Sequence, residues 1–180
     1  IFIITLAVFA LRLAQAQQDS ATAPKKTEIG PFSNAVPDAQ TIAHADANPT
    51  LASDLGAMSY AVTTANAEAQ KFFDQGLRLA YAFNHLEAVR SFRKARTLDP
   101  TCAMCYWGEA LVLGPNINAG MDAASTAPAY AAASKAQELA GKTTPKERAL
   151  IAALAARYAK EAPEDRAPLD KAYAEAMQKV

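Results

Sequence analysis

Apolar and small residues recur at helical spacing from residue 67 to residue 100, and no other part of the sequence restricts the fold as strongly. Asn66 is a suitable N-cap, and the apolar residues after it recur every three or four positions to about Phe83. The segment "FNHLE" that follows predicts a turn. A second amphipathic stretch begins at Ala88 and is stopped by Asp99-Pro100. We therefore expect two antiparallel helices joined by a tight turn.

The composition favours helices throughout the chain. Its 180 residues are 51% hydrophobic, which is enough for a real core, and they are rich in alanine with only seven glycines. The 18 basic and 18 acidic residues leave no net charge, and neither sign forms a long run. This balance argues against nucleic-acid binding, because neutralising phosphates needs a basic face. An all-α fold is expected.

Eight residues of this hairpin stand at characteristic spacings: Phe72, Gln75, Gly76, Leu79, Ala88, Phe92, Ala95 and Pro100. Small residues at positions 76 and 88 suit a close crossing of the two helices, and the large ones fill the space between them. The spacing resembles that of a tetratricopeptide repeat, a helical pair of 34 residues. Phe, Gln and Leu stand where the family pattern has Trp, Leu and Tyr.

The resemblance implies further repeats along the chain. A step of 34 residues from Phe72, Gly76 and Leu79 leads to Tyr106, Ala110 and Leu113. The partner helix of this second pair is expected only after a long loop, "GPNINAGMDAASTAP", which adds about seven residues to the usual period. A third pair begins at Thr144, where Pro145 and Glu147 complete a strong helix start.

The expected architecture is therefore a right-handed tetratricopeptide-like solenoid over residues 66–180. Its helix pairs cover about residues 67–100, 101–141 and 144–180, and more repeats are expected beyond Val180. From Ala69 to Asp122 the chain is similar to large exported bacterial tetratricopeptide-repeat proteins without an assigned activity. That similarity implies a longer parent chain and supplies no catalytic residues.

The N-terminal part predicts export. Residues 1–16, "IFIITLAVFALRLAQA", are mostly apolar and end in a small-x-small triplet, which is typical of a cleaved secretory signal. The alternative is a membrane anchor, but the run is short and Arg12 interrupts it. Residues 17–65 predict a largely irregular leader, in which "LGAMSYAV" is a short strand or a segment lying on the first helix. We expect a periplasmic or extracellular protein without a stable membrane span after cleavage.

The two cysteines, Cys102 and Cys105, leave two interpretations open. A covalent haem site would need histidine where Tyr106 stands, and a structural zinc site would need a second ligand pair. Packing as two small buried residues is the favoured interpretation, and a local disulfide is the alternative. His85 is expected to be solvated or bonded to backbone. No catalytic, metal or cofactor site is expected in the chain.

In tetratricopeptide arrays the first helix of each pair lines a concave groove, so the resemblance implies a partner protein or peptide. Gln70 also falls on this side of the first helix. The function expected is an exported interaction scaffold; the alternative is a platform within a larger enzyme or metal-handling protein. The groove could equally be covered by the leader or by further repeats. The residues expected to line the groove and anchor a partner are Phe73, Leu77, Tyr81, Met104, Trp107 and Leu111.

Overall fold

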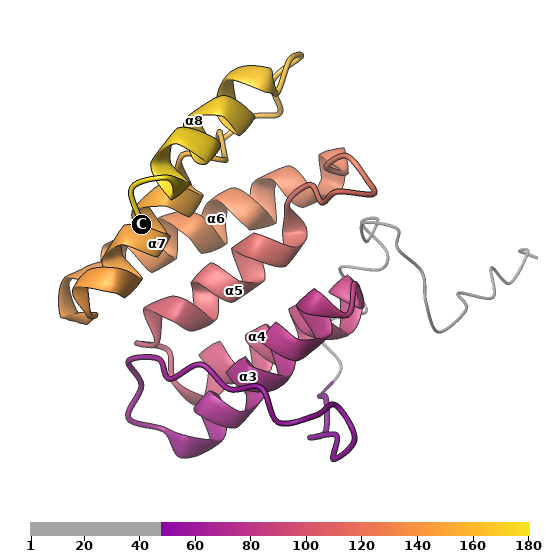
Figure 1. Cartoon of the computed structure of the whole chain (residues 1–180), viewed down its shortest axis with the longest axis vertical. Coiled ribbons are helices and arrows are strands. Elements are labelled where there is room, and N and C mark those ends of the chain that lie inside the picture. Colours follow the sequence, from indigo (N-terminus) through magenta and orange to yellow (C-terminus); the bar gives the residue numbers. More distant parts are fainter. Residues whose placement is uncertain (1–47) are drawn as a thin grey trace, which may run out of the picture. The chain divides into compact units, whose positions relative to one another are not determined.

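The computed structural model describes residues 48–180 (Figure 1). The expected signal segment lies outside the described residues, as does most of the expected leader with its histidine, His44, for which a solvated loop position is expected. Within the described part all regular elements are helical, which confirms the all-α expectation there. The elements are α3 Ala67–Tyr81, α4 His85–Leu98, α5 Ala103–Leu113, α6 Ala123–Leu139, the 3-10 turn η1 Ala140–Lys142, α7 Pro145–Ala155 and α8 Ala167–Met177.

Each helix packs against the next one along the chain. In addition, α3 contacts α5 and α5 contacts α7, so the first helices of successive pairs also meet. None of the helices in the described part is long and apolar enough to cross a membrane.

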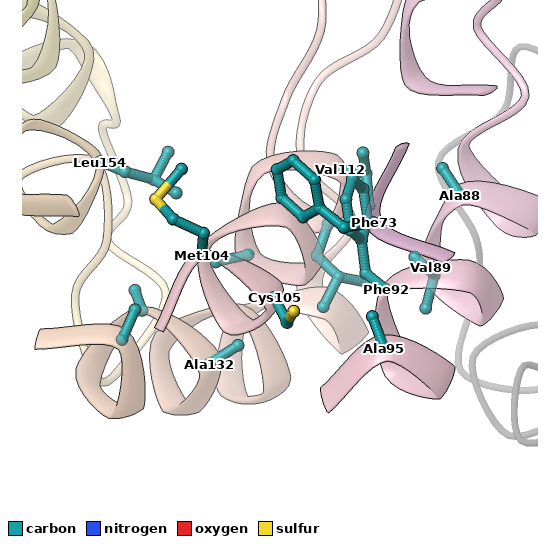
Figure 2. Packing of buried hydrophobic residues seen from close by; sticks show 14 of the residues in the cluster. Phe73, Ala88, Val89, Phe92, Ala95, Met104, Cys105, Val112, Ala132 and Leu154 are labelled. Carbon is teal, nitrogen blue, oxygen red and sulfur yellow. The ribbon is translucent and has the colours of Figure 1, made fainter. Parts of the chain in front are cut away.

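The core is built around Phe92 of α4, which is fully buried (Figure 2). Its ring meets Phe73 edge to face, with 5.5 Å between the ring centroids. Two glycines border the same ring: a Cβ added at Gly76 would lie 2.8 Å from it, and one added at Gly108 would lie 2.3 Å from it. The close crossing expected at Gly76 is therefore present, and Gly108 of α5 provides a second one that the sequence did not single out.

A buried carboxylate joins α4 to α5. Glu109 is 3% exposed and forms ion pairs with Arg93 at 2.8 Å and with Arg96 at 2.7 Å. The Arg96 guanidinium also lies 5.4 Å from the centre of the Tyr106 ring. A buried charge is tolerated only when it is paired, so Glu109 can be buried here because the two arginines pair with it.

Two expected boundaries are wrong. The turn after α3 is shorter than "FNHLE", because Phe83 takes a left-handed backbone conformation (φ 59°) and α4 already starts at His85. In the second pair, α6 starts at Ala123, well before the expected helix, because the Asp122 side chain caps it. Pro128 lies inside α6 rather than ending the loop. The capping box expected at Thr144 and Glu147 is confirmed at the start of α7.

Candidate interaction surface

Residues 48–66 lie along α3 (Figure 1), and we call this segment the strap. It contains no helix or strand, so of the two structures expected for "LGAMSYAV" the segment on the first helix is observed. From Tyr60 to Asn66 its residues alternate between partly buried and exposed. This period of two is that of a β-strand, although no second strand pairs with it among the described residues. Leu55, Tyr60 and Val62 pack against the core.

Two glutamines of α3 bind the strap through its backbone. The Gln70 side chain accepts the Val62 N–H at 3.0 Å and donates to the Tyr60 carbonyl at 2.9 Å. The Gln75 side chain accepts the Ala52 N–H at 2.8 Å and donates to the Thr50 carbonyl at 3.0 Å. Each amide thus satisfies one backbone donor and one acceptor two residues apart, as a neighbouring strand would.

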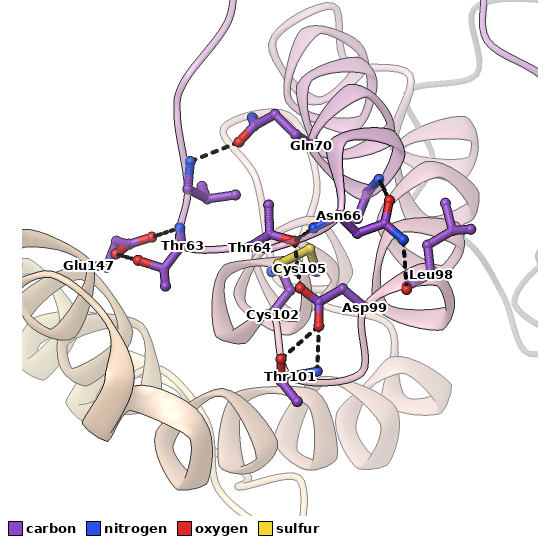
Figure 3. Close-up of a disulfide and its surroundings, with 12 residues drawn as sticks. Thr63, Thr64, Asn66, Gln70, Leu98, Asp99, Thr101, Cys102, Cys105 and Glu147 are labelled. Carbon is purple, nitrogen blue, oxygen red and sulfur yellow. Dashed lines mark hydrogen bonds between the residues drawn. A yellow bond between two sulfur atoms is a disulfide. The ribbon is translucent and has the colours of Figure 1, made fainter.

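Three carboxylates bind hydroxyl groups of the strap. Asp74 accepts from the Ser59 hydroxyl at 2.7 Å, and Glu147 of α7 accepts from the Thr63 hydroxyl at 2.6 Å. Asp99, after α4, accepts from the Thr64 hydroxyl at 2.5 Å (Figure 3). The strap also donates backbone N–H groups, from Tyr60 to Asp74 at 3.0 Å and from Thr63 to Glu147 at 2.7 Å.

All three carboxylates are buried, with Asp74 7%, Asp99 8% and Glu147 2% exposed. A buried carboxylate without donors is costly, and the strap supplies part of the donors that these groups need. Gln70, Thr101 and Thr144 supply further donors to Asp74, Asp99 and Glu147. We call Gln70, Asp74, Gln75, Asp99 and Glu147 the clamp. It combines residues from α3, α7 and the turn after α4.

Hydrogen bonding holds two clamp residues in their charged forms. Burial by itself raises the pKa of Asp99, but bonds from Thr64 and Thr101 outweigh it, so the pKa lies below its usual 3.8. The same balance applies to Glu147: burial raises its pKa, and bonds from Thr63 and Thr144 bring it below the usual 4.5. Both groups are therefore anions at neutral pH, and the strap supplies part of the stabilisation.

The cysteines lie beneath the point where the strap joins α3. Cys102 and Cys105 form a disulfide across the first turn of α5, and neither is exposed (Figure 3). The favoured interpretation was correct about burial and wrong about free thiols, since i and i+3 at a helix start bring the two sulfur atoms together. Cys102 is also the N-cap residue of α5, and its backbone N–H donates to the Asp99 carbonyl at 3.1 Å. The disulfide and the clamp thus share one turn.

The expected anchors of the groove divide into two groups. Phe73 and Met104 are 0% and 1% exposed and belong to the core, so their assignment as partner contacts is wrong (Figure 2). Phe73 faces α4, where its ring meets that of Phe92. Met104 points toward Leu154 of α7 (Figure 2). Replacing Phe73 by alanine would cost about 3–5 kcal/mol of stability, so it cannot report on binding.

The other expected anchors are accessible. Leu77, Trp107 and Leu111 are partly exposed, and Tyr81 is 71% exposed at the end of α3. The Trp107 indole N–H donates to the Leu150 carbonyl of α7 at 3.1 Å, so this partly exposed residue joins α5 to α7. These accessible apolar side chains lie on α3 and α5.

The described part of the chain shows no candidate metal site. It holds no cluster of three or more histidine, cysteine, aspartate or glutamate side chains that could bind a metal ion. His85 is 7% exposed, contrary to the expected solvated turn residue, and neither ring nitrogen has a hydrogen-bond partner among the described residues. Burial lowers the pKa of His85 below its usual 6.5, so the neutral ring predominates at pH 7.

Comparisons with protein-family models, with curated proteins and with solved structures return no match for this chain. The tetratricopeptide resemblance therefore rests on the residues of the sequence.

One clamp residue departs from the tetratricopeptide pattern, and the structure explains the departure. Gln75 stands where the repeat pattern has leucine, and in the structure its amide binds the strap and the Ser91 hydroxyl of α4, at 3.2 Å. Asp74 and Glu147 gave no such signal, because an acidic residue near a helix start or on a helix is ordinary. Their roles depend on where the strap lies.

Proposed function

We propose that the protein is an exported interaction scaffold of tetratricopeptide type, whose first helices bind an extended segment of a partner protein. The observation that carries this proposal is the backbone binding by Gln70 and Gln75. Hydrogen bonds to main-chain N–H and C=O groups hold a polypeptide whatever its side chains are, as in other modes of extended-peptide recognition.

The packing supports a repeat architecture. First helices of successive pairs contact each other, and Phe92 is enclosed by glycines from two successive first helices. Such contacts between neighbouring pairs are how a helical array buries a continuous core.

The accessible apolar side chains support a binding role. Leu77, Trp107 and Leu111 lie on first helices and stay partly exposed. Of these, tryptophan is a residue type enriched among the contact residues of interfaces.

The disulfide supports export. A bridge between Cys102 and Cys105 persists in an oxidising compartment and is rare in a reducing one. The apolar, Ala-Gln-Ala-terminated start of the sequence agrees with the same destination.

Selection of peptides from a random library on the full chain tests the proposal. Selected peptides should bind in fluorescence anisotropy, and Leu77→Glu or Leu111→Glu should weaken them by about 10-fold or more, because a charge replaces apolar contact. Tyr130→Ala on α6, outside the first helices, is the matched control and should leave the affinity unchanged. Circular dichroism of each variant shows whether the helices are kept.

Two results would contradict the proposal. One is a library that yields no peptide binding to the full chain. The other is a set of peptides whose affinity is equal for the wild type, both glutamate variants and Tyr130→Ala.

A further inference from the structure

We infer that the strap is an internal ligand of the partner site, and that the partner segment it keeps out carries serine or threonine at the positions of Ser59, Thr63 and Thr64. This inference rests on the proposed function and specifies its ligand. The ligand class is an extended, uncharged, hydroxyl-bearing polypeptide.

The clamp carboxylates set this preference. Each accepts a hydrogen bond from a hydroxyl group, with 2.7 Å or less between the two oxygen atoms, and each is at most 8% exposed. An apolar side chain at one of these places would leave a buried anion short of a donor. An acidic or phosphorylated side chain there would place like charges together, which is also unfavourable.

The backbone contacts fix the register of the segment. Gln70 holds the Tyr60 carbonyl and the Val62 N–H, so the hydroxyls on either side fall opposite Asp74 and Glu147. Tyr60 and Val62 pack against the core, and the Lys146 ammonium lies 5.8 Å from the Tyr60 ring centre. The preferred segment is therefore hydroxyl, aromatic, any residue, aliphatic, hydroxyl, hydroxyl, as in Ser59 to Thr64.

The strap competes with any such partner from within the same chain. It is covalently continuous with α3 at Asn66, so its local concentration at the clamp is of millimolar order. A partner must displace the strap. The partner's apparent affinity is its intrinsic affinity multiplied by the fraction of molecules whose strap is undocked. Weakening the strap should therefore strengthen partner binding.

Binding of a fluorescein-labelled peptide with the sequence of residues 57–66 to the full chain tests this inference. The variant Ser59→Ala/Thr63→Val/Thr64→Val should bind the peptide at least about 10-fold more tightly than the wild type, because three strap bonds are lost and the clamp is kept. Ser53→Ala alters an exposed strap serine that donates to no clamp carboxylate, and it should bind as the wild type does. Circular dichroism and the single variant Thr63→Val guard against unfolding of the triple variant; the single variant should show a smaller gain.

Changes in the peptide test the hydroxyl preference on the same variant. Valine at both threonine positions and alanine at the serine should weaken binding about 10-fold or more, and glutamate at the three positions should abolish it. The inference is overturned if the triple variant gains no affinity, if it fails to bind the peptide, or if the peptide without hydroxyls binds equally well. Library peptides that bind at Leu77 and Leu111 without any gain in the triple variant would overturn this inference and leave the proposed function standing.

Discussion

Phe92 shows how single residues determine the packing of this chain. Its ring occupies space that Gly76 and Gly108 leave free on two different helices. Only the absence of a Cβ permits these approaches, because both backbones lie against a fully buried ring. Glycine is unfavourable inside a helix by about 1 kcal/mol relative to alanine, so its presence in α3 and α5 indicates a packing requirement.

Gly108→Ala should therefore destabilise the protein by about 1–3 kcal/mol, despite the higher helix propensity of alanine. The added Cβ would lie 2.3 Å from the Phe92 ring, which is fully buried and has little room to move. Urea unfolding followed by circular dichroism measures the change. Gly141→Ala is the matched control, since nothing lies within 4 Å of a Cβ there, and its stability should stay close to that of the wild type. Equal stability of the two variants would contradict this packing.

His85 predicts a pH dependence at the residue scale. Its pKa is lowered from 6.5 by burial, so the unfolded chain binds a proton at a higher pH than the folded one. The free energy of unfolding should be at its full value above pH 6.5 and should fall as the pH drops through 6.5 towards the lowered pKa. Urea unfolding at pH 7.5 and pH 5.5 measures this difference. His85→Phe, which removes the titrating group, should show a smaller one; an unchanged difference would assign the effect to another group.

At the scale of elements, the strap joins parts of the chain that are far apart in sequence. Thr63 binds α7 through Glu147, and Thr64 binds the turn after α4 through Asp99. The segment thus connects the first and third helix pairs without being a helix itself. Buried side-chain groups, rather than a backbone ladder, satisfy its polar atoms.

Acid should weaken this connection. Asp99 and Glu147 have pKa values below their usual 3.8 and 4.5, so their contribution to stability is present above those values and is lost as the pH falls through the lowered ones. The free energy of unfolding should decrease between pH 5 and pH 2.5. The decrease should be smaller in Asp99→Asn/Glu147→Gln, while Glu164→Gln, an exposed carboxylate, should leave it unchanged. An equal decrease in all three proteins would show that the clamp is not responsible.

The disulfide acts within a single element, because it closes only the first turn of α5. A loop this short should contribute at most about 2 kcal/mol through the entropy of the unfolded chain. Cys102→Ser/Cys105→Ser should therefore lower the midpoint of urea unfolding while keeping the helical circular dichroism signal. Wild-type protein that is denatured without reductant should react with no thiol reagent. Two reactive thiols per chain would show that the bridge is absent.

The helices themselves could be predicted from the sequence wherever local signals were sufficient. Asn66 and Thr144 mark helix starts because capping depends on a few neighbouring residues. Pro128 was misleading, since α6 continues through it although a proline at the sixth residue of a helix removes one backbone hydrogen bond. The clamp could not be predicted, because its bonds join residues up to 84 positions apart. Phe73 and Met104 were placed on the wrong side because helical spacing gives a face but not the neighbour that covers it.

At the scale of the whole described chain, the first helices of successive pairs contact each other and carry the proposed partner site. Part of that site is already filled by the strap, through backbone groups that any extended polypeptide has. The account therefore depends on one claim: the clamp holds an extended chain by its main-chain amides.

Amide hydrogen exchange at single residues, followed by nuclear magnetic resonance, tests this claim most directly. Ala52, Tyr60, Val62 and Thr63 donate their N–H groups to clamp side chains and should exchange slowly. Ala61, an exposed strap residue between two of them, should exchange fast. Gln70→Ala should accelerate exchange at Val62 above all. Uniformly fast exchange across residues 48–66 in the wild type would show that the strap is not held, and the proposed mode of binding would then be wrong.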